Sequence, residues 1–178
     1  MATLKSTLIT NRDATPKVFT DAFISGGQLS QSYGFIYTGA SDAAGTNYKM
    51  VSVPSDARLS SLGFINTTLG NSSKVDVTAW YPTTIQSGGG NFLAQSLAGT
   101  IISSSAFVAG MLGDTTNNTM LELITVATTL NYPQYQEMPL WQFLGLATDP
   151  GLSIDLGLSV RVAVATAGYI GMKATYVY

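Results

Sequence analysis

A chain of 178 residues is long enough for one domain, and only 10% of its residues are charged, against about 25% in a typical soluble domain. It contains no histidine and no cysteine, which excludes Ser-His-Asp and Cys-His nucleophiles, imidazole- or thiolate-bound metals, and disulfides. The net charge is −2 and the eight basic residues are scattered, which argues against nucleic acid as a partner.

The N-terminal residues 1–30 predict an extended arm ahead of a single domain over residues 31–178. The apolar residues of the arm come in short pairs without a helical period: Leu8 and Ile9, Val18 and Phe19, Phe23 and Ile24. Such a segment cannot bury itself, so we expect it to be mobile or to lie across a neighbouring subunit with these six residues as anchors. The first 21 residues lack the apolar core of a secretory signal.

Strand signals recur from residue 33 onward, over residues 33–37, 48–53 and 57–66. The clearest alternation is in residues 74–81, where the apolar side chains Val75, Val77 and Ala79 share one face. Trp80 lies on the opposite face, so we predict that it is exposed unless a partner, the arm or a second layer covers it. We take it as a candidate partner-binding residue.

Residues 92–113 carry no charge and are long enough to span a bilayer as a helix. Gln95 and a run of three serines at 103–105 favour two buried strands around a turn instead. Residues 117–130 predict a further strand. We therefore expect no membrane association.

The C-terminal part predicts a short helix over residues 139–146, because proline stands at its first turn and glycine near its end. Residues 159–165 and 169–178 flank a Thr-Ala-Gly turn and predict a terminal β-hairpin. In its first strand we expect Val160, Val162 and Val164 to point inward and Arg161 outward. The fold class that follows is all-β, an antiparallel β-sandwich or barrel with at most one short helix.

No pattern in the sequence points to catalysis, a cofactor or a metal, and we predict none of them. The carboxylates lack a recognisable pair spacing, and the loop at residues 114–118 has a single carboxylate, too little charge for a tight calcium site. Asp149-Pro150-Gly151 is explained by turn chemistry. The triple glycine at 88–90 lacks the Gly-Lys-Ser/Thr of a phosphate loop, and the sequons at Asn66, Asn71 and Asn117 are expected by chance.

Several segments resemble the small jelly-roll cement, or decoration, proteins of tailed bacteriophages. They are residues 53–59, 74–80, 139–151, 166–168 and 176–178. The resemblance implies a jelly roll that forms a homo-oligomer, a dimer or a trimer, on the capsid exterior. It implies a virion structural protein, made in the host cytoplasm, that binds and bridges major capsid protein subunits and stabilises the head. No motif fixes which residues would touch the capsid.

Two alternatives remain open at this point. A receptor- or carbohydrate-binding module of a phage tail or fibre would also suit a sandwich with exposed Trp and Tyr side chains. A membrane-active protein would use residues 92–113. Binding to a glycan array would indicate the first, and partition into detergent the second.

Overall fold

The computed structural model describes residues 28–67, 69–70, 72–83, 95–104, 106–107, 111–112, 120–123 and 138–177. Within these residues nearly all regular structure is β; the helical residues are those of one 3-10 turn, of one α-helix of four residues, and Leu123. The elements are β1 (Leu29–Thr38), β2 (Asn47–Pro54), β3 (Arg58–Asn66), β4 (Lys74–Trp80), η1 (Gln95–Leu97), β5 (Ile101–Ser103), β6 (Met111–Leu112), β7 (Leu121–Glu122), α5 (Leu140–Phe143), β8 (Ser153–Val162) and β9 (Gly168–Val177).

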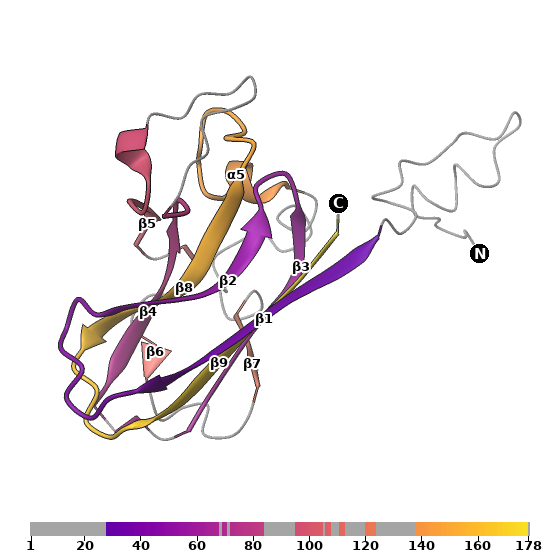
Figure 1. The fold of residues 1–178 in the computed structure, drawn as a ribbon. Helices are drawn as coiled ribbons and strands as arrows, with labels where there is room; N and C mark the ends of the chain where they lie inside the picture. The colour runs from indigo at the N-terminus through magenta and orange to yellow at the C-terminus, as the bar shows by residue number, and fades with distance from the viewer. Residues whose placement is uncertain are drawn as a thin grey trace, which may run out of the picture.

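The strands form two antiparallel sheets packed as a sandwich (Figure 1). One sheet has the order β1-β9-β3-β7; the other has the order β2-β8-β4, with β5 and β6 both pairing along the outer edge of β4. Strands β1 to β4 alternate between the two sheets, and so do β8 and β9. This is the connectivity of a jelly roll, so the predicted fold class is confirmed.

The core lies between the sheets and is built from alternate residues of the long strands. Val75, Val77 and Ala79 of β4 are at most 1% exposed, as the alternation predicts. They meet the inward side chains of the other long strands, which include Leu62, Phe64, Ile154, Leu156, Leu158, Ile170 and Met172. Burying one such large apolar side chain contributes about 1.5–3 kcal/mol, so this layer is the main source of stability.

The short helix predicted in the C-terminal part is confirmed as α5. Pro139 precedes its first residue, and Gly145 follows it with a φ of 76°, a conformation that favours glycine. The first backbone N–H groups of this segment, at Leu140 and Trp141, donate to the carbonyls of Ala57 and Ser55 at 2.8 and 2.9 Å. The helix is therefore fixed onto the turn between β2 and β3.

The turn that follows α5 is held by the carboxylate of Asp149. It accepts hydrogen bonds from the Ser55 hydroxyl and, at 2.9 Å, from the backbone N–H of Gly151. The prediction that this acidic residue serves turn geometry is confirmed. Two segments that carry the family resemblance, residues 53–59 and 139–151, thus contact each other and support the fold.

The predicted terminal hairpin is wrong. β8 pairs with β2 and β4 in one sheet, whereas β9 pairs with β1 and β3 in the other. The residues between them carry the chain across the sandwich and are held there by Val164, whose N–H donates to the Asp42 carbonyl at 3.0 Å and whose carbonyl accepts from the Ser41 N–H at 2.9 Å. A turn signal marks where strands end but does not say whether they pair with each other.

Within β8 the predicted inward side is correct for Val160, at 2% exposed, and wrong for Val162, at 39%. The pairing of β4 with β8 shifts register here, since Lys74 lies opposite Val162 and Val75 opposite Val160. Such a bulge interrupts the alternation and turns the next side chain outward. Arg161 points outward as predicted.

Residues 101–103 and 111–112 form β5 and β6, in agreement with the prediction of strands in this uncharged segment. In the part of the chain that the structure describes, there is no helix long and apolar enough to cross a membrane. Of the strand predicted over residues 117–130, the two residues of β7 are observed. The prediction is wrong for Leu123, which is helical, and most of the rest lies outside the described residues.

Candidate binding face on the β1–β9 sheet

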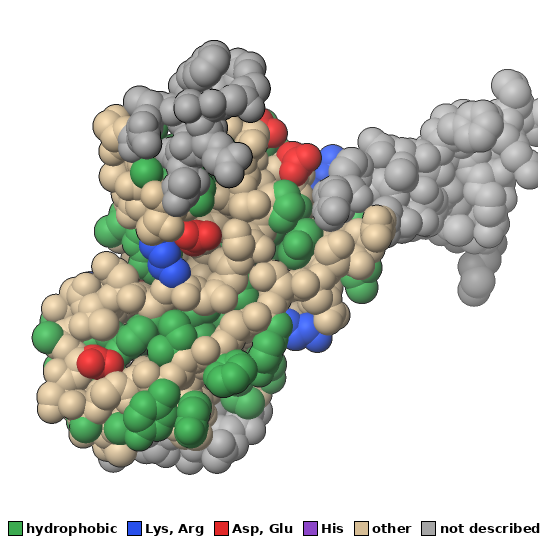
Figure 2. All heavy atoms as spheres, viewed as in Figure 1, with side chains coloured by type: hydrophobic (Ala, Val, Ile, Leu, Met, Phe, Trp, Pro, Cys, Tyr) green, Lys and Arg blue, Asp and Glu red, His purple; other side chains and the backbone are tan. Residues whose placement is uncertain are grey.

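The outer face of the first sheet carries a row of large exposed apolar side chains. Leu29, Tyr33, Phe35 and Tyr37 alternate along β1, and Tyr169 lies beside them on β9. Their exposed fractions run from 56% to 66%. Figure 2 shows hydrophobic side chains gathered over the region where Figure 1 draws β1 and β9, with little charge among them. We call these five residues the aromatic face.

The aromatic face is created by strand pairing between distant parts of the chain. β1 and β9 pair in one continuous register, which sets Tyr37 opposite Tyr169, Phe35 opposite Gly171 and Tyr33 opposite Lys173. The rings of Tyr37 and Tyr169 meet edge to face, with centroids 4.9 Å apart. Such cross-strand pairs hold the rings in place on the surface without burying them.

A groove of about 300 Å³ opens in this face. It is lined by Tyr33, Phe35, Ile65, Asn66, Thr67, Tyr169, Ile170 and Gly171. Gly171 lies between Phe35 of β1 and Ile65 of β3 in the register, and a Cβ added there would come within 3.0 Å of Ile65 Cγ2. The missing side chain at Gly171 therefore keeps the groove open.

One cation belongs to the same surface. Lys173 is half-buried next to Tyr33, and its ammonium group forms no hydrogen bond or ion pair with any other residue that the structure describes. Glu122 of the neighbouring β7 instead accepts hydrogen bonds from the Leu62 N–H, at 2.8 Å, and from the Ser61 hydroxyl. An apolar surface with a single unengaged ammonium group is suited to binding another molecule.

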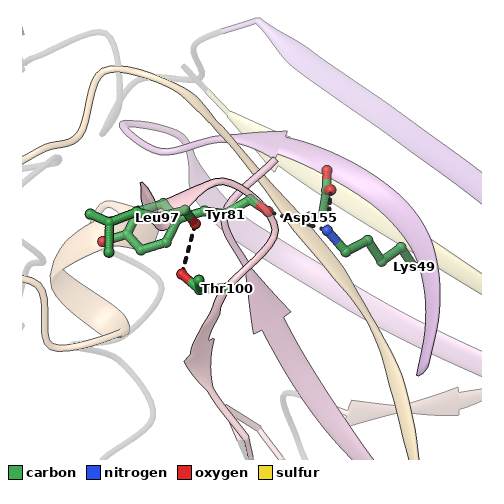
Figure 3. A network of polar contacts seen from close by, with 5 residues as sticks. All are labelled: Lys49, Tyr81, Leu97, Thr100 and Asp155. Carbon is green, nitrogen blue, oxygen red and sulfur yellow. Dashed lines mark hydrogen bonds and ion pairs between the residues drawn. The ribbon is translucent and has the colours of Figure 1, made fainter. Parts of the chain in front are cut away.

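A polar cluster occupies the outer face of the other sheet (Figure 3). Lys49 Nζ lies 3.3 Å from Asp155 Oδ2 and 3.2 Å from the Tyr81 carbonyl oxygen. The Tyr81 N–H in turn donates to the Thr100 carbonyl at 3.0 Å, and the Thr100 hydroxyl donates to the Leu97 carbonyl at 2.7 Å. These contacts tie β2, β8 and β4 to the turn after η1, which gives the cluster a structural role.

Trp80 belongs to this second face, and it is covered within the chain itself, which is one of the alternatives that the sequence left open. Its side chain points away from the core as expected, yet it is 1% exposed. Lys49 Nζ lies 5.9 Å from the centre of its ring, and β5 pairs with β4 at Ala79 and Trp80. Trp80 therefore presents no surface to a partner in this fold.

The other predicted anchors, Leu8, Ile9, Val18, Phe19, Phe23 and Ile24, lie outside the described residues, as does the arm apart from residues 28–30. The last two of those residues already belong to β1. Sequence reasoning missed the aromatic face, although the spacing of Tyr33, Phe35 and Tyr37 at every second position was the signal. The contributions of Tyr169 and Gly171 required knowledge of the pairing.

Several other polar side chains have structural partners. Asp76 lies 3.6 Å from Arg161, and the Tyr48 hydroxyl donates to the Asp42 carboxylate. Burial raises the pKa of Tyr48, and the bond to Asp42 and its negative charge raise it further. Asn66, the first sequon residue, is 2% exposed in β3. Among the described residues, no three carboxylates come together as a metal site would require.

Comparisons with known proteins identify no family for this chain. No protein-family model matches it, and no curated protein matches it. Among solved structures, it is similar to a chain described as "Cyanophage Pam1 capsid asymmetric unit", with 13% identity over 85% of this chain and 86% of that one, and a TM-score of 0.37. A TM-score of this size does not establish a shared fold, so the proposal below takes no support from this similarity.

Proposed function

We propose that this chain is a virion structural protein, a capsid cement protein that binds and bridges major capsid protein subunits on the capsid exterior, and that it is not an enzyme. The observation that carries the proposal is the aromatic face. A protein that worked alone in water would gain nothing from presenting five large apolar side chains on one sheet. A protein that works inside an assembly buries them against neighbours.

The size of the face favours a macromolecular partner. Since a large aromatic side chain offers about 150–250 Å², five large apolar side chains at the observed exposure present on the order of 600 Å². This is at the upper end of the largest apolar patches on monomers, about 300–600 Å². It also approaches the roughly 800 Å² that each partner buries in a stable protein–protein interface.

The virion setting is supported by the sequence resemblance and by the composition. With 10% charged residues the chain has little charge to keep a large apolar surface in solution by itself. The residues that precede β1 carry three apolar pairs of their own. One subunit would then have two separate binding surfaces, the aromatic face and the arm, so that it can link neighbouring proteins of the assembly.

Cross-linking and mass spectrometry of purified particles would test the proposal. We expect the chain to be present in the particle and cross-linked to the major capsid protein. Deleting residues 2–27, which leaves β1 intact, should give a folded protein that decorates particles poorly. Absence from the particle, or full occupancy by the truncated protein, would contradict the bridging role.

The groove gives a second candidate, the carbohydrate-binding module of a phage tail or fibre. Tyr33 and Tyr169 flank a trough that could hold a sugar ring by stacking. A glycan array separates the two candidates, because a cement protein should bind no sugar. Binding that is lost in Tyr169→Ala would favour the module.

A further inference from the structure

We propose that the aromatic face binds the same face of a second copy of this chain about a two-fold axis. The axis lies between the two stacked faces, runs parallel to the strands, and passes over the line midway between β1 and β9. This inference rests on the proposed role of the aromatic face as a protein-binding surface, and it names the partner. The arm and the remaining surface then stay available for the capsid.

The first argument is that the face is complementary to itself. A two-fold axis between β1 and β9 sets each β1 side chain over the β9 residue of the other copy that corresponds to its own pairing partner. Phe35, which is 66% exposed, pairs with Gly171, so in the dimer each Phe35 ring faces the Gly171 groove of the partner. A protrusion and a hollow in the same row of one surface satisfy the requirement of an isologous interface.

The second argument is the size of the groove. A cavity of about 150 Å³ is enough to hold a benzene molecule. The groove over Gly171 has about 300 Å³ and is lined mainly by apolar and aromatic groups. It can therefore take a phenyl ring, and a ring inserted in a pocket at the centre of an interface is the usual form of a binding hot spot.

The third argument is that the dimer gives the ammonium group of Lys173 a partner. The same axis sets Lys173 over Tyr33 of the other copy, because these residues are paired in the register of each subunit. An ammonium group over a tyrosine ring is attracted to it, so the cation of the face is engaged and not simply desolvated. Leu29 likewise faces Val177, which extends the apolar contact toward the end of both strands.

Sedimentation analysis of the full-length protein over a range of concentrations tests the interface. We expect a dimer, and Phe35→Ser should weaken dimerisation by at least about 30-fold. The matched control is Ile101→Ser, which removes an apolar side chain that is 52% exposed on the other sheet and should change dimerisation less than about twofold. Phe35 is mostly exposed, so the variant should remain folded. Its thermal melt checks this.

The absence of cysteine makes the geometry directly measurable with single spin labels. Packed sheets lie about 10 Å apart and paired strands about 4.8 Å apart, so labels at Gln31→Cys should be attached to Cα atoms about 11 Å apart in the dimer. Labels at Ile101→Cys, on β5 of the second sheet, should lie much farther apart, because the second sheets of the two copies are on the outside of the dimer. Strong dipolar broadening at the first position and none at the second is the expected result.

A chain that is monomeric at all concentrations, or a dimer that Phe35→Ser leaves intact, would overturn the inference. So would a monomer whose aromatic face binds a hydrophobic dye only after deletion of residues 2–27, because the arm would then be the occupant. These outcomes differ from failure of the proposed function, in which the dimer forms but is absent from particles.

Discussion

The two outer faces of the sandwich show opposite uses of aromatic side chains. On the β1–β9 sheet, Phe35 is 66% exposed and has no covering layer among the described residues, whereas Trp80 on the β4 side is 1% exposed. Both point away from the core, and both sit in a strand with regular alternation. The difference teaches that an outward side chain is not the same as an exposed one, because contacts beyond its own strand decide what covers it.

The largest expected difference between the two faces is in how far a truncated aromatic side chain lowers the free energy of unfolding. Trp80→Ala should lower the free energy of unfolding by about 3–5 kcal/mol, since it empties a fully buried position. In the monomer, Tyr33→Ala on the aromatic face should lower it by less than about 1 kcal/mol, because that ring is 63% exposed. Urea denaturation of both variants measures the difference. Equal losses would show that the two faces are not distinct.

The stability cost of replacing a glycine with alanine should also differ between the two faces. A Cβ at Gly157 would lie 2.0 Å from the backbone carbonyl oxygen of Tyr48, whereas at Gly171 the nearest atom, 3.0 Å away, belongs to a side chain. Gly157→Ala should therefore cost about 1–3 kcal/mol or more, since backbone must move. Gly171→Ala should cost less than Gly157→Ala in the same denaturation assay. The reverse order would contradict the described packing of β8 against β2.

Alkaline pH should reveal the contact between Tyr48 and Asp42. The folded pKa of Tyr48 is raised above the unfolded value of about 10, so the stability it contributes is complete below pH 10 and is lost as the pH rises further. The loss should approach about 1.4 kcal/mol per pH unit for this single proton. Tyr48→Phe should lose less stability between pH 10 and 11. Identical slopes for the variant and the parent protein would refute this.

The smallest expected effect is the difference in stability between variants of two lysines. Lys49→Met breaks the ion pair with Asp155 and should lower stability by about 0.5 kcal/mol, an effect that salt reduces. Lys173→Met, which removes the cation of the aromatic face, should leave the stability of the monomer unchanged. Thermal melts of both variants at low and high salt make the comparison. A larger loss in Lys173→Met would reveal a contact within the subunit.

Local pattern determined a substantial part of this protein. The alternation in β4 identified its buried face, and the proline and glycine around residues 139–145 marked α5. These features follow from the chemistry of neighbours in the chain, because side chains alternate along a strand and proline and glycine restrict or permit particular backbone angles. The low charge predicts a surface that other molecules cover, and this stays a prediction.

Only the tertiary structure decided which strands pair and what covers each face. It set β8 and β9 in different sheets, turned Val162 outward at a bulge, and buried Trp80. It also joined β1 to β9 from the far end of the chain, and so produced the aromatic face and its groove. The physical reason is that pairing and coverage depend on the burial of the whole core, a non-local sum to which each segment contributes little by itself.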